Sequence, residues 1–131
     1  MATYKRFEDL PVWQNARKFA SNADRIINLS PIAKSFKLRD QMLGSSGSVM
    51  DNIAEGFERS GNKEFIQFLY IAKGSAGEFR SQLYRASDAN NISEENFKIL
   101  YEEAEHLSTE LGNFIKYLYS SDMKGYKYSR S

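Results

Sequence analysis

The long proline-free stretch is the strongest constraint on the fold of this chain. Both prolines, Pro11 and Pro31, lie early, and residues 32–131 contain none. A proline inside a helix removes a hydrogen bond and clashes with the preceding turn, so its absence permits long helices. Apolar side chains in this stretch recur at steps of three and four residues, whereas the alternation typical of a strand is not sustained. The sequence therefore predicts an all-α protein.

Turn-forming residues divide the chain into four predicted helices. The first is expected to begin near Asp9, which could cap it, and Pro11 suits an early helical position because its missing N–H needs no partner there. The residue before Pro31 is pushed out of the helical region, so the helix ends there. We expect Asn62 and Ser93 to cap the last two helices. The other helices are expected at about residues 36–59, 63–89 and 94–119, with a short helical turn within 32–36.

A line of polar residues crosses the second predicted helix, beside its apolar stripe of Val49, Ile53 and Phe57. Its steps of three and four residues place it where another helix would meet it. We expect these side chains to be hydrogen-bonded partners that fix helix register and an oligomer, and a ligand-binding role is the alternative. This predicted polar seam consists of Gln41, Ser45, Ser48, Asn52 and Glu55 of the second helix with Ser75 and Glu78 of the third, and Arg59 extends it.

Glycines interrupt the same helix. Gly44 and Gly47 would each cost about 1 kcal/mol relative to alanine in a helix interior, so they need a reason, and we expect the close approach of a neighbouring backbone. The third helix carries a similar run of small residues at 74–77. If the two helices form a hairpin about Gly61, then Gly47 and Ser75 lie opposite each other, because each is 14 residues from the turn.

Four long helices joined by short links favour an antiparallel up-down-up-down four-helix bundle. We expect one domain over residues 1–120, followed by a flexible basic and aromatic tail at 121–131. Cysteine is absent, the N-terminus lacks the apolar run of a signal peptide, and no segment is long and apolar enough to cross a membrane. The expected location is the cytoplasm, with no membrane partner.

The net charge of +1 gives no general nucleic-acid signature. An oligomer would nevertheless multiply a small cationic patch, so a weak charge per chain is compatible with RNA binding. The tail also interleaves cations with aromatic rings, which suits stacking on single-stranded RNA. An ordinary solvated surface and a disordered terminus are the alternative. The candidate RNA-binding residues are Arg17, Lys18, Arg25, Arg80, Arg85, Lys124, Lys127 and Arg130.

The sequence contains no recognisable catalytic or metal-binding motif. Glu103 and His106 have the spacing of one half of a di-iron site in a helix bundle, but such a site needs two of these units and His106 is the only histidine. A Ser–His–acid triad would require the same histidine, and no serine lies in a nucleophile elbow. We therefore predict a protein that is not an enzyme and has no cofactor and no metal.

Four motifs follow one another along the chain. Residues 7–14 read Phe-Glu-Asp-Leu-Pro-Val-Trp-Gln, residues 48–56 read Ser-Val-Met-Asp-Asn-Ile-Ala-Glu-Gly, residues 59–65 read Arg-Ser-Gly-Asn-Lys-Glu-Phe, and residues 68–78 read Phe-Leu-Tyr-Ile-Ala-Lys-Gly-Ser-Ala-Gly-Glu. In this order they resemble the bacterial four-helix-bundle proteins encoded in intervening sequences of 23S ribosomal RNA genes, sometimes labelled ribosomal-protein-like. The accessory variability protein of diversity-generating retroelements is similar. The resemblance extends to Tyr119.

This resemblance implies a ring-like homopentamer and a link to RNA or, in the retroelement branch, to a reverse transcriptase. The common members have no established biochemical role. Relatives often carry arginines just before the serine of the seam, where this chain has Leu43, Gly44 and Ser45. The resemblance therefore does not place nucleic-acid binding on the second helix.

Two functional hypotheses follow. The first is a homo-oligomeric bundle, pentameric by resemblance, that associates with structured RNA. The second is a scaffold that contacts another polypeptide, such as a polymerase or reverse transcriptase, without binding RNA.

Overall fold

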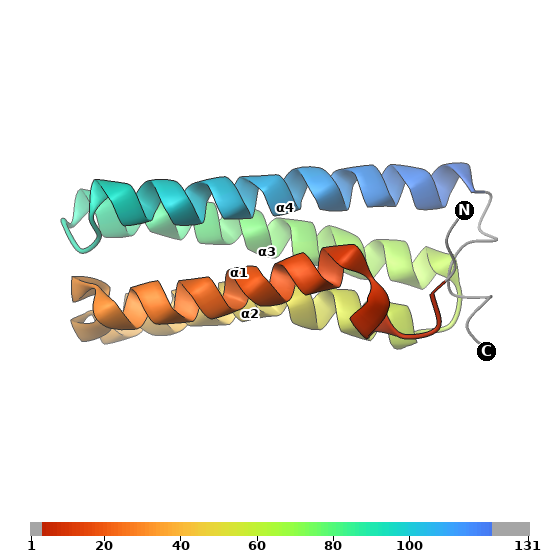
Figure 1. Cartoon of the computed structure of the whole chain (residues 1–131), viewed down its shortest axis with the longest axis horizontal. Helices are drawn as coiled ribbons and strands as arrows, with labels where there is room; N and C mark the ends of the chain where they lie inside the picture. Colours follow the sequence, from red (N-terminus) through yellow and green to blue (C-terminus); the bar gives the residue numbers. More distant parts are fainter. Residues whose placement is uncertain (1–3, 122–131) are drawn as a thin grey trace.

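Four long α-helices lie side by side in the computed structural model of the chain, which describes residues 4–121 (Figure 1). They are α1 (Pro11–Leu29), α2 (Phe36–Glu58), α3 (Asn62–Asp88) and α4 (Glu94–Ser120), with short 3-10 turns η1 (Phe7–Asp9) and η2 (Pro31–Lys34). Consecutive helices run in opposite directions, and residues 4–121 include no strand. The predicted all-α, up-down-up-down four-helix bundle is confirmed.

The helix ends agree closely with the predicted ones, but two of the three expected caps are wrong. Asp9 lies in η1, and Leu10 occupies the N-cap position of α1 without a side-chain hydrogen bond. Asn62 does not cap α3, because Gly61, with a φ of 84°, occupies the N-cap position. Asn62 is instead the first residue of the helix, and its side chain is fully buried. Ser93 does cap α4, since its hydroxyl accepts a hydrogen bond from the Asn96 N–H at 3.1 Å.

Aromatic rings fill the centre of the bundle. Phe19 of α1 and Phe79 of α3 meet edge to face with their centroids 5.0 Å apart. Near the α2–α3 turn, Phe65 packs in the same manner against Phe57 at 5.8 Å and against Phe114 at 5.6 Å. Burying rings of this size dominates the energy of a core. The helical stripes of the sequence therefore converge on one continuous core.

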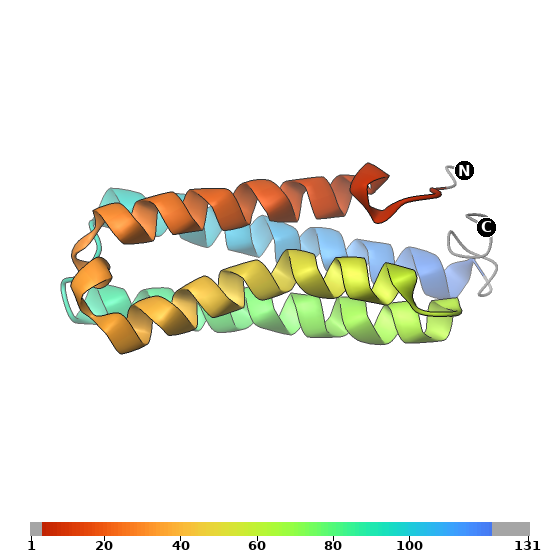
Figure 2. The same ribbon diagram turned by 90° about the horizontal axis from the view of Figure 1, so that it is seen from below.

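The helix pairs are not packed equally. Helices α2 and α3 form the most extensive contact and α1 and α4 the least extensive of the four neighbouring pairs (Figure 2). A Cβ built on Gly56 of α2 would lie 2.6 Å from the Cβ of Phe68, so only glycine allows this approach. At Gly44 and Gly47 a Cβ would meet nothing within 4 Å. The close approach predicted at those two glycines is therefore not made within the chain, because they lie on the outward side of α2.

Candidate functional site

The polar seam lies between α2 and α3, as the hairpin arithmetic predicted. Ser45 Oγ donates to Gln82 Oε1 at 2.6 Å, and Ser48 and Ser75 share a hydrogen bond of 3.0 Å. Asn52 Nδ2 donates to the carbonyl and the hydroxyl of Ser48, each at 2.8 Å. The three serines thus form neutral hydrogen bonds across the seam, whereas Asn52 bonds within α2, and these small side chains let the two helices lie close together.

The carboxylates of the predicted seam do not take part in this pairing. Glu55 is exposed and accepts a hydrogen bond from Arg59 at 2.9 Å, which raises the pKa of the Arg59 guanidinium. Glu78 is also exposed. A hollow of about 590 Å³ opens along the outer edge of the seam and is lined by Gln41, Gly44, Ser45, Ser48, Glu78, Ser81, Gln82 and Arg85.

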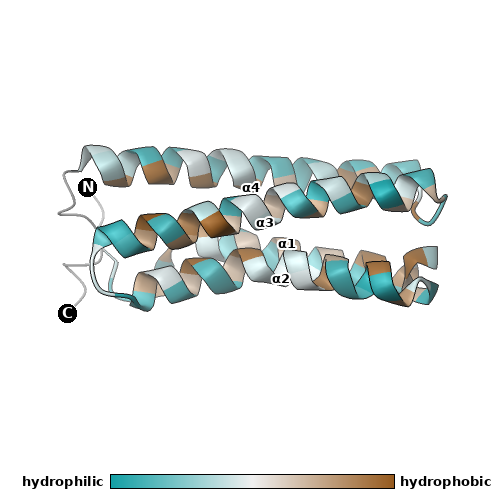
Figure 3. Ribbon diagram, turned by 180° about the vertical axis from the view of Figure 1, so that it is seen from behind, coloured by the Kyte–Doolittle hydropathy of each residue, from teal (hydrophilic) through white to brown (hydrophobic). Residues whose placement is uncertain are grey.

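The solvent-facing side of this helix pair combines small and apolar residues. A Cβ on Gly74 would meet nothing within 4 Å, as at Gly44. One turn before Gly74, Tyr70 and Ile71 leave 52% and 50% of their surface exposed. Figure 3 shows hydrophobic segments in this half of α3. We call the surface formed by Gly44, Tyr70, Ile71, Gly74 and Glu78 the outer α2–α3 face.

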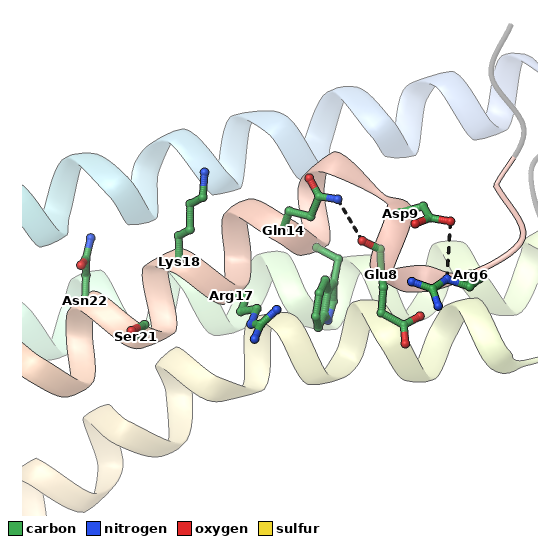
Figure 4. A pocket seen from close by; sticks show the side chains of 9 residues that line it. Arg6, Glu8, Asp9, Gln14, Arg17, Lys18, Ser21 and Asn22 are labelled. Carbon is green, nitrogen blue, oxygen red and sulfur yellow. Dashed lines mark hydrogen bonds and ion pairs between the residues drawn. The ribbon is translucent and has the colours of Figure 1, made fainter.

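A hollow of about 930 Å³ lies along α1 and is called here the α1 hollow (Figure 4). Its upstream end is held in place by two contacts: Gln14 Nε2 donates to the carbonyl of Glu8 at 2.9 Å, and Arg6 pairs with Asp9 at 3.6 Å. The lining residues are Arg6, Glu8, Asp9, Trp13, Gln14, Arg17, Lys18, Ser21 and Asn22.

Two cations of the α1 hollow keep their charge free. Neither Arg17 nor Lys18 belongs to an ion pair within residues 4–121. The Arg17 guanidinium lies 5.7 Å from the centroid of the Trp13 ring. Because Trp13 is buried, its ring supports Arg17 rather than offering a free face to a base. Lys18 points toward α4 in Figure 4.

Amide–carboxylate pairs join α1 to α4. Asn15 Nδ2 lies 3.1 and 3.2 Å from the two carboxylate oxygens of Glu110, and Asn22 Nδ2 donates to Glu103 at 2.9 Å. Burial raises the pKa of Glu103, whereas the Asn22 hydrogen bond and the charge of Arg25 oppose that rise. Arg25 therefore lies within electrostatic reach of a carboxylate and is less free than Arg17.

The structure distributes the predicted RNA-binding cations over three faces. Arg17, Lys18 and Arg25 lie on α1, while Arg80 lies between α3 and α4 and donates to Ser108 Oγ at 3.4 Å. Arg85 lies in the α2–α3 seam, where its Nη1 donates to Gln41 Oε1 at 3.0 Å. Lys124, Lys127 and Arg130 lie outside the described residues.

Within residues 4–121, no group of three or more histidine, cysteine, aspartate or glutamate side chains is arranged to hold a metal ion. Glu103 and His106 line a hollow of about 250 Å³ between α1 and α4, together with Asn15, Lys18, Phe19, Asn22 and Leu107. None of the helices described is both long and apolar enough to cross a bilayer.

Sequence reasoning missed the α1–α4 pairs, although the sequence contains a signal for them. Asn15 and Asn22 are seven residues apart, and so are Glu103 and Glu110. Equal heptad spacing on two antiparallel helices brings both pairs together at once. Arg6 and Gln14 of the α1 hollow were also missed, because their position depends on η1 folding back along α1.

The fold and these surfaces define a small four-helix bundle whose described residues offer polar hollows and seams. Residues 8–113 match the family of 23S rRNA-intervening sequence proteins, and the chain belongs to that family. The resemblance predicted from the four motifs is thereby confirmed, apart from its retroelement branch, which stays a prediction.

A solved structure has the same fold. It is a protein of unknown function from the S23 ribosomal protein family of Bacteroides thetaiotaomicron, with a TM-score of 0.72 and 24% sequence identity over 80% of this chain and 98% of that chain. Neither the family nor this structure indicates a class of enzyme. A comparison with curated proteins gave no match.

Proposed function

We propose that this chain is a non-enzymatic bundle that assembles with copies of itself and binds structured RNA along α1. One observation carries the RNA proposal: Arg17 and Lys18 line a single open hollow, and neither is neutralised by a carboxylate within the described residues. The family description, which names an intervening sequence of 23S rRNA, supports the same ligand class.

The chemistry of the α1 hollow suits a phosphate backbone. An arginine presents a planar fork of donors to phosphate oxygens, and a lysine adds a point charge. Phosphate contacts of this kind release counterions and give binding that weakens with salt. A single copy offers few such contacts, but an oligomer repeats them and gains affinity through multivalency.

The test is a titration of the purified protein against fluorescently labelled ribosomal RNA, measured by anisotropy at low and at physiological salt. We expect binding that weakens with salt and survives at the higher level. The Arg17→Gln/Lys18→Gln/Arg25→Gln variant should bind at least tenfold more weakly. Its matched control, Lys34→Gln/Lys37→Gln/Lys63→Gln, removes three exposed cations from other elements and should bind like the unmodified chain.

The proposal would be overturned if the two triple variants weakened binding equally, because a general loss of charge would then explain both. It would also be overturned if the unmodified chain failed to bind at either salt level.

The outer α2–α3 face supports self-association. Gly44 and Gly74 each destabilise their helix by about 1 kcal/mol relative to alanine. A Cβ at either position would meet nothing within 4 Å, so packing within the chain does not require a glycine there. The half-exposed Tyr70 and Ile71 beside Gly74 add apolar area that a second copy would remove from water. We propose a second copy as the occupant of this face and, by family resemblance, a ring of five copies.

Native mass spectrometry tests this contact. Ile71→Glu should lower the assembled mass, because a carboxylate would be placed in an apolar contact. Leu29→Glu is the matched control, since Leu29 is 80% exposed at the far end of α1 and lies outside the face. An Ile71→Glu protein that keeps the mass of the unmodified assembly would contradict the assignment.

The second candidate function is a scaffold for another polypeptide, such as a polymerase, without RNA binding. The same half-exposed Tyr70 and Ile71 favour it, because apolar surface of this kind fits protein contacts. Absence of RNA binding at low salt, together with capture of a nucleic-acid-processing protein that Ile71→Glu abolishes, would favour this function over the first.

A further inference from the structure

A cationic groove between α3 and α4 is not used by any surface described so far. The two helices are neighbours in the bundle and lie close together at the end where the α3–α4 turn joins them (Figure 3). The groove encloses about 440 Å³ and is lined by Lys73 and Arg80 of α3 and by Glu105, Ser108, Thr109, Gly112, Asn113 and Lys116 of α4.

Glycines allow the groove to hold long cationic side chains. A Cβ on Gly112 would lie 3.5 Å from Lys73 Cε, so the lysine stem crosses α4 where that helix has no side chain. A Cβ on Gly77 would lie 3.5 Å from Arg80 Nη2. Lysine and arginine commonly bury their stems along a surface and keep the charged head in contact with water. The two heads are thereby held at the groove.

The groove carries more positive than negative charge. Its lining has three cations, Lys73, Arg80 and Lys116, and one carboxylate, Glu105. None of the three cations forms an ion pair within residues 4–121. Arg80 lies 5.8 Å from the centroid of the Tyr101 ring, and its buried Nε has no hydrogen-bond partner. Donors are therefore present in excess of acceptors.

The cations are arranged in a row. Lys73 and Arg80 are seven residues apart on α3, which corresponds to about 10.5 Å along the helix axis. Gly112 contacts Lys73, and Lys116 lies one turn beyond Gly112, so the two lysines share one end of the groove. Arg80 contacts Ser108 at the other end. The Arg80 head folds back toward Lys73, since its Nη2 would lie 3.5 Å from a Cβ on Gly77, so the two ends lie on successive helical turns, a spacing that a ligand with several phosphates can follow.

We propose that the α3–α4 groove binds successive phosphate groups, with Lys73 and Lys116 holding one phosphate and Arg80 with Ser108 holding another. The hydroxyl of Thr109 and the amide of Asn113 line the groove between the two ends and supply neutral donors. The backbone of a single nucleic-acid strand has this chemistry, and so does a free polyphosphate. The site is separate from the α1 hollow and shares no lining residue with it.

The test measures anisotropy of a labelled single-stranded RNA oligonucleotide bound by the full chain. Lys73→Gln/Lys116→Gln should weaken binding at least tenfold at low salt and reduce the slope of log K against log salt by about 0.7, because the contact to one phosphate of a single strand is lost. The matched control is Lys63→Gln/Lys98→Gln, which removes one exposed lysine from each of the same two helices outside the groove. It should bind like the unmodified chain.

A steric variant tests whether the ligand occupies the groove itself, independently of the charge of its lining. Gly112→Leu fills the groove without changing any charge, and leucine favours a helix more than glycine does. We expect a loss of affinity similar to that of the lysine pair, with unchanged helical circular dichroism. Equal weakening by the two lysine pairs, or undiminished binding by Gly112→Leu, would overturn the proposal.

Competition identifies the source of the phosphate. If inorganic tripolyphosphate displaces the strand at a matching phosphate concentration, the site takes free polyphosphates, and if it does not, the site takes a nucleic-acid strand.

The α1 variants distinguish the groove proposal from the proposed function. Loss of binding in the α1 triple variant alone would retain the proposed function and reject the groove, whereas loss in the groove variants alone would do the reverse.

Discussion

The polar contact between α2 and α3 is built differently from the polar contact between α1 and α4. In the buried part of the α2–α3 contact the partners are neutral, such as Ser48 and Ser75 at 3.0 Å, and the helices approach until Gly56 touches Phe68. Between α1 and α4 the partners are amides and carboxylates, such as Asn22 and Glu103 at 2.9 Å, and the packing of the two helices is the least extensive of the four neighbouring pairs. Short hydroxyls permit close packing, whereas longer charged groups keep the helices apart and in contact with water.

The largest expected effect comes from filling the closest contact of the α2–α3 pair. Gly56→Ala would place a Cβ 2.6 Å from the Cβ of Phe68, an atom next to the backbone that cannot move freely. Overpacking at the upper end of the usual range costs about 3 kcal/mol. The helical preference of alanine returns about 1 kcal/mol. We expect a net loss of about 2 kcal/mol in urea unfolding, and an unchanged midpoint would show that the two helices can separate freely.

A smaller effect is expected from removing one hydrogen-bond donor in each contact. Ser45→Ala leaves Gln82 Oε1 buried without its donor, and we expect a loss of about 1.5 kcal/mol. Asn15→Ala leaves Glu110 at a wetter surface, so the change should stay within about 0.5 kcal/mol. Urea unfolding of both variants measures the difference. Equal losses of unfolding free energy would mean that the two contacts are equally shielded from water.

A gain of about 1 kcal/mol is expected from Gly44→Ala, because a Cβ there meets nothing within 4 Å and alanine is the better helix former. Thermal and urea unfolding at low protein concentration, where copies separate, measure it. If the gain disappears at high concentration, the new methyl group meets a second copy. A loss at low concentration would contradict the open position of Gly44.

The smallest effect concerns pH. Burial raises the pKa of Glu103, so the folded chain holds the proton more tightly than the unfolded chain does. The folded state is therefore penalised once the pH rises above the unfolded pKa, and the penalty is complete above the folded one. Glu103→Gln should stabilise the protein slightly at pH 7 and leave it unchanged at pH 3. A gain that was the same at both pH values would show that the carboxylate charge is not its cause.

Local signals in the sequence were enough to predict the helices and the α2–α3 contact. Pro11, Pro31, Gly61 and Ser93 mark helix ends through backbone geometry that needs no tertiary information. Counting residues on either side of Gly61 placed Gly47 opposite Ser75, one residue from the observed Ser48–Ser75 hydrogen bond, because a short turn fixes the register of a helical hairpin.

The helix caps, the environment of the glycines and the α3–α4 groove could not be predicted in this way. They depend on the rotation of each helix about its axis and on the conformation of the residues that flank it. Asp9 does not cap α1 because it is part of a 3-10 turn, and Asn62 does not cap α3 because Gly61 occupies the N-cap position. The reason for Gly44 was misassigned, since periodicity does not distinguish a face toward a neighbouring helix from a face toward solvent. The cations Lys73 and Lys116 share a groove only because two distant helices present them to each other.

The position of Trp13 has a practical consequence. It is the only tryptophan in the chain, and it is enclosed by the Phe7 ring at 5.1 Å and by the guanidinium of Arg17. The tryptophan emission of the protein therefore reports on one location, the lining of the α1 hollow. A ligand that draws Arg17 away would admit water to the indole and shift that emission to longer wavelength. The unlabelled wild-type chain thus contains its own optical probe for binding at α1.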